Sequence, residues 1–504
     1  SSPVNSVNGN KKIDRRSVLR LGAAAGAVAS VGAVEVAVNS VGTRAVASAA
    51  PNQAPFPFTG LTSGLVVTDL EVVTVTDTSV TFSWATYAGP HPAWGKLAPL
   101  APADTEVALV PVGADEGGEL PVVHKDEAQV GYHFVTVDKL RPGTTYRFEC
   151  RSNGLVAEPG LITRNLPNTP EQTGRFTTLV APEGEYLTTI AILNDTHIGE
   201  NGHGIVVGNL PAPIFPEAGA APYPEVMLTA ALAELRGMGI EKVFVNGDAT
   251  SEARPAEVRR FAEIMNTFGA PERQWFVTRG NHDRPHKPDA DSSAGYDEFP
   301  VLEGTEDHRD PFGVLLGRPR QELWVTQQGP VRVIGLDSSK LDESGGEISP
   351  EQFDALEREL QRDPSKPTVV LAHHPITSEA GWTHAAGPTF ILNSADARRL
   401  QQMLNDAPGV FFAGAGHTHR AKRTRGDVGA GVDYLETGAC KAYPGGYTLL
   451  HVYSGGYQVN FHRLSSEDAL AWTARARWAM YGFEPEALLG ELSDRNYVVN
   501  RVIA

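Results

Sequence analysis

The residues Asn194-Asp195-Thr196-His197 directly follow an apolar run at 186–193, Tyr-Leu-Thr-Thr-Ile-Ala-Ile-Leu. Apolar and β-branched side chains fill this run, which predicts a buried strand. A strand that ends in Asp-x-His presents a carboxylate and an imidazole at the C-terminal edge of its sheet, where open α/β sheets bind ligands. Taken alone, the pair more often marks an ordinary polar strand end, so its meaning depends on the rest of the chain.

Four more polar clusters follow, and each comes directly after an apolar run. They are Gly247-Asp248 after 243–246, Gly280-Asn281-His282-Asp283 after 275–278, His373-His374-Pro375 after 368–372, and Gly416-His417-Thr418-His419 after 410–413. Carboxylate and imidazole groups are ligands for hard and borderline divalent cations. Five such clusters at five strand ends therefore indicate a metal site at the edge of a sheet.

In this order the motifs resemble those of the calcineurin-like metallophosphoesterase superfamily, which run D-x-H, G-D, G-N-H-D/E, H and G-H-x-H. The resemblance extends over roughly residues 186–462. It implies an α/β fold in which two mixed β-sheets stack as a layered sandwich flanked by helices. The alternation of strand and helix patterns after residue 186, with a helix start at Ser349-Pro350, also favours a layered α/β fold.

The resemblance implies a site for two divalent metal ions, with Mn, Fe and Zn as candidates. The implied ligands are Asp195, His197 and His419 for one ion, Asn281, His373 and His417 for the other, and Asp248 as a bridge between both. Two ions roughly 3.5–4 Å apart clamp a phosphoryl group and share a hydroxide. That hydroxide is expected to attack phosphorus in line with the leaving oxygen.

The same resemblance gives His282 a catalytic role instead of a metal-binding one. We expect His282 to donate a proton to the leaving alkoxide and Asp283 to orient the imidazole of His282. Other histidines, His203, His374 and His384, are expected to be loop or pocket residues without a ligand role. The insertion at 199–224, which contains His203, is rich in Gly and Pro and is a candidate cover for the site.

Two positions depart from related patterns. In purple acid phosphatases a Tyr follows the Gly-Asp motif by three residues, whereas this chain has Ser251 there. A pair of divalent ions is therefore the expectation, without a tyrosine–iron(III) ligand. Arg279 precedes Gly280 where a small residue or Pro is more usual. It is interpreted either as a ligand for the substrate phosphate or as a partner in a surface ion pair.

The start of the chain has features of an export signal. Residues 14–20, Asp-Arg-Arg-Ser-Val-Leu-Arg, resemble a twin-arginine motif, and the apolar run 21–34 and Ala47-Ser48-Ala49 follow it. This apolar run is shorter than the roughly 18–20 residues that span a bilayer. We therefore predict a cleaved signal at 1–49, a Pro-rich linker at 50–63, a secreted protein and no stable membrane insertion.

Short alternating strands predict an all-β domain at 64–180. The stretch 140–146 resembles the tyrosine corner of a fibronectin type III sandwich, with Trp84 and Tyr146 as expected core residues. A domain of this kind also precedes the catalytic domain of purple acid phosphatases. We expect the catalytic domain at 181–463 and a C-terminal segment, 464–504, packed on it.

Composition limits the possible partners. The formal net charge is −17, so nucleic acid is not an expected partner, although a metal site would still accept a small phosphate ester. The two cysteines, Cys150 and Cys440, do not form a disulfide framework, and whether they are bridged stays open. A zinc β-lactamase pattern fails because Arg420-Ala421-Lys422 follows His419. The oligomeric state is not predicted.

The expected function is that of a secreted, binuclear metal-dependent phosphoesterase. The alternative is a non-catalytic extracellular binding module with a degenerate phosphoesterase domain, but degenerate copies usually lose ligands and here every position is filled. Asp283 after Asn281-His282 and the absent Tyr favour a diesterase, whereas the all-β domain favours a phosphatase. Monoesters and diesters both remain candidate substrates.

Overall fold

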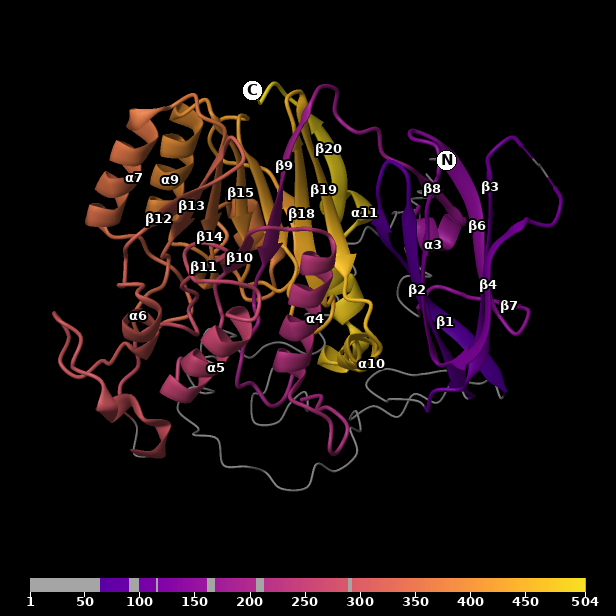
Figure 1. Ribbon diagram of the computed structural model, residues 1–504, viewed down its shortest axis with the longest axis horizontal. Helices are drawn as coiled ribbons and strands as arrows, with labels where there is room; N and C mark the ends of the chain where they lie inside the picture. The colour runs from indigo at the N-terminus through magenta and orange to yellow at the C-terminus, as the bar shows by residue number, and fades with distance from the viewer. Residues whose placement is uncertain are drawn as a thin grey trace, which may run out of the picture.

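The computed structural model describes residues 64–89, 99–114, 117–160, 168–204, 213–288 and 292–503. The predicted export signal and linker lie outside these residues. Among the helices that are described, none has the length and apolar character needed to cross a membrane. Figure 1 shows an all-β part, drawn in indigo and purple, beside a larger α/β part.

Two six-stranded mixed sheets form the α/β part. The first has the order β11-β10-β9-β18-β19-β20, with β9 (Tyr186–Leu193), β10 (Val243–Asn246), β11 (Trp275–Thr278), β18 (Gly446–Tyr453), β19 (Gly456–Arg463) and β20 (Asn496–Asn500). The second has the order β12-β13-β14-β15-β17-β16, with β12 (Trp324–Gln328), β13 (Val331–Leu336), β14 (Thr368–Ala372), β15 (Val410–Ala415), β16 (Ala421–Thr424) and β17 (Asp433–Thr437). The predicted mixed α/β architecture is therefore confirmed.

Each sheet contains a parallel block that carries the polar motifs at its C-terminal ends. Strands β9, β10 and β11 are parallel neighbours, and so are β13, β14, β15 and β17. Parallel strands buried on both faces have continuous apolar sequences, and every residue of β10, β11, β14 and β15 is buried. Ile192 of β9, Phe244 of β10 and Val333 of β13 share one core between the two sheets.

Helices cover the outer face of each sheet. On the first sheet these are α4 (Tyr223–Gly237), α5 (Pro255–Met265) and α10 (Glu467–Ala476), and on the second α7 (Pro350–Arg362) and α9 (Ser394–Asp406). Smaller helices, α6 (Pro311–Leu316), α8 (Ser378–Thr383) and η4 (Pro388–Phe390), lie in the loops. The predicted start of α7 is present: the Ser349 side chain accepts a hydrogen bond from the backbone N of Gln352.

The all-β part consists of two antiparallel sheets. One contains β1 (Leu65–Val75), β2 (Val80–Ala88) and β5 (Tyr132–Val137), and the other contains β3 (Ala103–Pro111), β4 (Val122–Val130), β6 (Thr145–Ser152), β7 (Leu155–Val156) and β8 (Arg175–Thr177). Trp84 and Tyr146 are buried in its core, as predicted. The Tyr146 hydroxyl accepts a hydrogen bond from the backbone N of Arg141 at 2.9 Å, the contact expected at a tyrosine corner. The fibronectin type III assignment itself stays a prediction.

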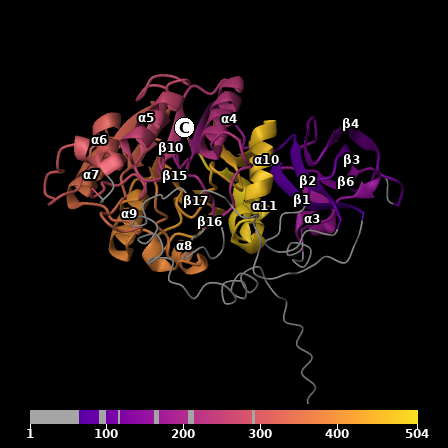
Figure 2. The same cartoon turned by 90° about the horizontal axis from the view of Figure 1, so that it is seen from below.

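The C-terminal segment lies between the two parts. Figure 2 shows α10 between α4 and the strands of the all-β part, and Trp472 and Trp478 are buried in the core that α4 shares. The segment also adds β20 to the first sheet through antiparallel pairing with β19, which the sequence did not predict. Cys150 and Cys440 are buried free thiols in separate cores, so no bridge joins the two parts.

Candidate metal centre

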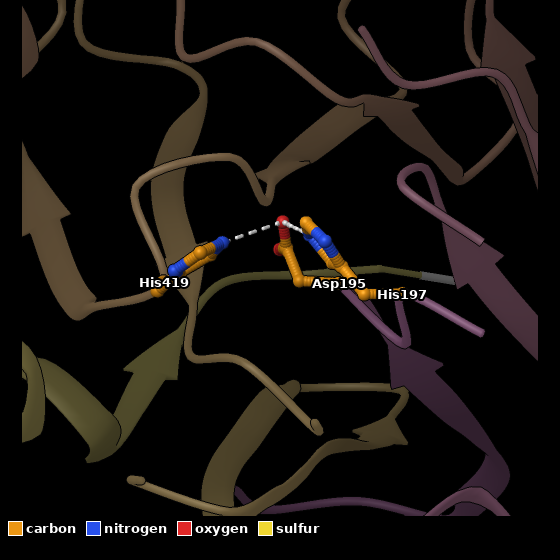
Figure 3. Close-up of side chains that lie close together, drawn as sticks. All are labelled: Asp195, His197 and His419. Atoms are coloured by element: carbon orange, nitrogen blue, oxygen red, sulfur yellow. Dashed lines mark ion pairs between the residues drawn. The ribbon is translucent and has the colours of Figure 1, made fainter. Parts of the chain in front are cut away.

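The loops that follow β9, β10, β11, β14 and β15 meet at one edge of the two sheets. Figure 3 shows Asp195 and His197 from the loop after β9 facing His419 from the loop after β15. Asp195 Oδ1 lies 3.3 Å from His419 Nε2 and 3.6 Å from His197 Nε2. These three side chains offer ligand atoms that all lie within 4.8 Å of one another.

Asp248, at the end of β10, connects this group to a second one. Its Oδ2 lies 3.0 Å from His373 Nε2 and 3.4 Å from His197 Nε2. Asp248, His373 and His417 again offer ligand atoms within 4.8 Å of one another. The structure therefore places Asp248 between the two groups, which is where a bridging carboxylate is expected.

Several buried atoms at this edge have no hydrogen-bond partner among the described residues. They are Asp195 Oδ1, His197 Nε2, His373 Nε2 and both side-chain polar atoms of Asn281. His197 Nδ1 also lacks a hydrogen bond of ordinary geometry, although it lies at ion-pair distance, 2.9 Å, from Glu200 Oε2. Buried polar atoms are normally paired, so an orphaned set that converges on one place points to a missing ligand. A set of two carboxylates, four imidazoles and one amide suits borderline divalent cations. The residues present thus fit the two ions that the motifs imply.

In His373 and His417, one ring nitrogen donates a hydrogen bond to a backbone carbonyl, which leaves the other nitrogen free to bind a metal. His373 Nδ1 donates to the Asn246 carbonyl at 2.9 Å, so Nε2 is the ligand atom. His417 Nε2 donates to the Phe390 carbonyl at 2.6 Å, so Nδ1 is the ligand atom. A partner on the outer nitrogen orients a metal-binding imidazole and sets its tautomer.

The backbone at this edge adopts conformations that L-residues rarely take. Positive φ angles occur at Asp195 (53°), His197 (43°), Asp248 (48°), His417 (70°) and His419 (58°). Such left-handed residues are typical of functional sites, where the surrounding fold holds the strained backbone. The loops also approach closely: a Cβ on Gly280 would lie 2.2 Å from the Asp248 backbone N. The glycines of the motifs therefore allow the ligand loops to touch.

The two carboxylates of the site carry negative charge. Burial raises the pKa of Asp195, but His419 and His197 beside it hold that pKa well below its usual value. Burial acts in the same direction on Asp248, and His373 and His282 lower its pKa well below the usual value. Both groups are thus ionised and available to a cation.

His282 lies at the rim of the site. Its ring centroid is 4.6 Å from that of His197, and its ligand atom groups with those of His197 and Asp248. Its Nδ1 donates to the Ser251 carbonyl at 2.6 Å, and its backbone N donates to Asp248 Oδ1 at 2.9 Å. The predicted role of His282 as a proton donor is compatible with this position and stays a prediction.

The prediction that Asp283 orients His282 is wrong. The buried Asp283 carboxylate accepts hydrogen bonds from the backbone N atoms of Ala249, Thr250 and Gly280 and from the Thr250 hydroxyl, at 2.7–3.0 Å. It therefore ties the loop after β10 to the loop after β11. Burial and the nearby Asp248 raise the pKa of Asp283. The carbonyl of Ser251, which the sequence did not single out, orients the imidazole instead.

Of the two interpretations of Arg279, the ion pair is confirmed, but it is buried and does not lie at the surface. Arg279 is buried, and its guanidinium binds the Asp310 carboxylate in a bidentate manner at 2.7 Å and 2.9 Å. Its Nε lies 3.2 Å from Asp337 Oδ2, and the guanidinium packs on the Phe312 ring. Arg279 thus anchors the segment that contains α6. Sequence alone could not reveal partners this far along the chain.

Two residues of the site were missed from the sequence. Glu200 Oε2 lies 2.9 Å from His197 Nδ1, and the buried Lys441 pairs with Glu200. Burial raises the pKa of Glu200, but Lys441 and His197 hold it well below its usual value. The position of Glu200, three residues after His197, was a possible signal, whereas nothing in the sequence marked Lys441.

The other histidines contact residues outside the two ligand groups. His374 Nε2 donates to the Ser344 carbonyl at 2.8 Å, and its Nδ1 lies 2.7 Å from the Ser338 hydroxyl. His203 Nε2 lies 2.8 Å from Glu484 Oε1, and this contact ties the insertion to the C-terminal segment. His384 stacks on Phe390.

Comparison with known families bears on the same region of the chain. Residues 188–421 match the family model of calcineurin-like phosphoesterases. These residues form a calcineurin-like phosphoesterase domain. The match includes all five motifs, from Asp195 to His419, and supports a metal-dependent phosphoester hydrolase.

One curated protein and several solved structures are similar to parts of this chain. A probable glycerophosphodiester phosphodiesterase GpdQ from Arcobacter nitrofigilis is 26% identical over 182 residues, which cover 36% of this chain and 58% of that protein. The match thus spans less than two thirds of the relative's length. A dimetal phosphatase from Danio rerio is 12% identical, with TM-score 0.39 and coverage of 56% of this chain and 98% of that one. Purple acid phosphatase PPD1 from yellow lupin (Lupinus luteus) seeds is 13% identical, with TM-score 0.38 and coverage of 86% and 74%.

Proposed function

We propose that this protein is a secreted phosphoesterase that uses two divalent metal ions to hydrolyse phosphate mono- or diesters. The observation that carries the proposal is the set of converging, buried ligand atoms without hydrogen-bond partners among the described residues. Degenerate modules lose such ligands, so the complete set argues against a purely non-catalytic role. Mn, Fe and Zn remain the candidate metals.

The protein's own residues divide the work. Asp195, Asp248 and the surrounding imidazoles would hold the two ions, which supply Lewis acidity to the phosphoryl oxygens and activate water near neutral pH. Because His282 Nδ1 donates to the Ser251 carbonyl, its Nε2 is the nitrogen that exchanges a proton. In the protonated ring, Nε2 gives its proton to the leaving oxygen while Nδ1 keeps its hydrogen bond.

A phosphodiester is the first substrate to test. The relative from Arcobacter nitrofigilis carries the name of a glycerophosphodiester phosphodiesterase, and its similarity supports this order. Position 251 is a serine, so a tyrosine ligand for iron(III) is absent there, and a pair of divalent ions remains part of the proposal. Export by the twin-arginine route, proposed from residues 14–49, is part of the same proposal.

The experiment is a substrate panel on the metal-stripped protein, reloaded in turn with Mn²⁺, Fe²⁺ and Zn²⁺. Bis-nitrophenyl phosphate, nitrophenyl phosphate, a glycerophosphodiester and a cyclic nucleotide cover the two ester classes. We expect hydrolysis to rise until two ions are bound per chain and to vanish on chelation. Full activity with one ion or none contradicts the binuclear proposal. No hydrolysis of any ester by the fully loaded protein leaves the non-catalytic alternative.

A further inference from the structure

The Glu200 carboxylate lies directly behind the metal ligand His197. Its Oε2 is 2.9 Å from His197 Nδ1, and its two oxygens are 2.8 Å and 2.7 Å from Lys441 Nζ. The Tyr223 hydroxyl also donates to Oε1. The carboxylate therefore has three partners and is held in one place on the outer side of the imidazole.

These partners come from separate parts of the fold. Tyr223 is the first residue of α4, and Lys441 lies in the loop between β17 and β18. The Lys441 backbone N donates to the Asp195 carbonyl at 3.1 Å, so this loop packs against the ligand loop itself. The Trp472 indole N of α10 donates to the Lys441 carbonyl at 2.9 Å, and its ring stacks on Tyr223 at 4.1 Å. The C-terminal segment thus braces the group.

His197 differs from the neighbouring histidines in the charge of its partner. His373, His417 and His282 each donate to a neutral backbone carbonyl, whereas His197 faces a carboxylate. An anionic partner makes the imidazole a stronger ligand and fixes its ring orientation more firmly than a carbonyl does. Lys441 balances the buried negative charge, so the carboxylate can remain ionised beside the site.

We infer that Glu200, held by Lys441 and Tyr223, is a positioning residue that sets the affinity of one metal ion, the one held by Asp195, His197 and His419. The other ion, assigned to Asn281, His373 and His417, does not depend on it. This inference rests on the proposed metal-dependent function. It also assigns a role to the C-terminal segment, which supports one metal position through Trp472.

The test is the pair of Mn²⁺ dissociation constants of the full mature chain, measured by titration of the metal-stripped protein with electron paramagnetic resonance detection. In Glu200→Gln we expect one constant to rise by about 10- to 100-fold, the range found for loss of such partners, and the other to stay unchanged. The weakened ion should be the one that His419→Ala abolishes. A milder variant, Tyr223→Phe, should raise the same constant by a smaller factor.

The matched control is Glu71→Gln. Glu71 is also a buried glutamate with a tyrosine hydroxyl and basic side chains as partners, but it lies between the two parts of the molecule. The Glu71→Gln substitution should lower the stability of the protein without changing either Mn²⁺ dissociation constant. Unchanged constants in both Glu200→Gln and Tyr223→Phe, or equal shifts of both ions, overturn the inference. Because the readout is metal binding, a protein that binds two ions without hydrolysing esters contradicts only the proposed function.

Discussion

The metal centre and the boundary between the two parts of the molecule both contain buried carboxylates, but their partners differ. At the boundary, Glu71 lies 2.7 Å from Arg463 and 3.1 Å from Arg477, and the Tyr443 hydroxyl donates to it at 3.0 Å. At the metal centre, Asp195 Oδ2 accepts hydrogen bonds from the Asn194 side chain and the His417 backbone N, whereas Oδ1 has imidazole nitrogens at 3.3 Å or more and no hydrogen-bond partner among the described residues. A carboxylate paired with permanent cations stabilises the fold, whereas one whose unpaired oxygen faces imidazoles is ready for a metal ion.

Energetics support this distinction. Burial raises the pKa of Glu71, and Arg463 and Arg477 bring it below the usual value, so the group stays charged inside the protein. Removing one member of such a buried pair leaves the other charges uncompensated. At the metal centre the compensating charge is expected from the ions. The same substitution, carboxylate to amide, should therefore have different consequences at the two places.

The largest effect is expected for Asp248→Asn. Its carboxylate lies between the two ligand groups, so the amide should weaken both ions. A metal ion supplies several kcal/mol of transition-state stabilisation, which makes a loss of about 10³-fold or more in kcat/KM the expected result. Metal analysis and kinetics on the same sample provide the measurement. Retention of two ions and of activity would place Asp248 outside the centre.

Glu71→Gln tests the other side of the comparison. Loss of one charge from a buried pair costs about 3–5 kcal/mol of unfolding free energy. We expect a matching shift of the urea unfolding curve, with metal content and kcat unchanged per folded molecule. If metal content falls together with stability, the boundary and the metal centre are coupled and the distinction fails.

A third prediction concerns His133, a buried histidine in the all-β part. Burial lowers the pKa of His133 to about 4, with Asp104 opposing, and the ring is held between Trp84 and the Thr105 hydroxyl. The unfolded chain takes up this proton near pH 6.5 and the folded chain only near pH 4. Stability is therefore fully present above pH 6.5 and is lost as the pH falls toward 4, by about 3 kcal/mol.

His133→Gln removes this titrating group. The difference in unfolding free energy between the wild type and the variant should shrink as the pH falls from 6.5 to 4. If the difference is constant over this range, the pKa of His133 is not lowered in the folded protein and the prediction is wrong.

The smallest effect is expected for His282→Ala. Since His282 is not assigned to either ion, both metals should remain. An alkyl ester needs a proton on its leaving oxygen, whereas a nitrophenyl ester hardly does, so the alkyl ester should lose about 10²-fold more activity. Equal losses on both esters, with the metals retained, would leave only a role in binding the phosphate. Loss of a metal would make His282 part of the centre itself, with His197 and Asp248.

Much of the site follows from local sequence patterns. Apolar runs predict buried strands, and residues directly after parallel strands emerge at one sheet edge, so Asp195, Asp248, His373 and His417 were expected to meet. The structure brings them together. The stacked mixed sheets were likewise predicted from the alternation of strands and helices and from the motif resemblance.

The tertiary structure alone decided which partners the charged side chains found. Asp283 binds the backbone of a neighbouring loop, Arg279 binds Asp310, and Glu200 meets Lys441 from the far end of the domain. Strand β20 joined the first sheet for the same reason. Local sequence patterns indicate which positions are buried and which face of a strand or helix packs against the core. The identity of a long-range partner depends on which loops the packed sheets bring together, and that information is spread over the whole chain.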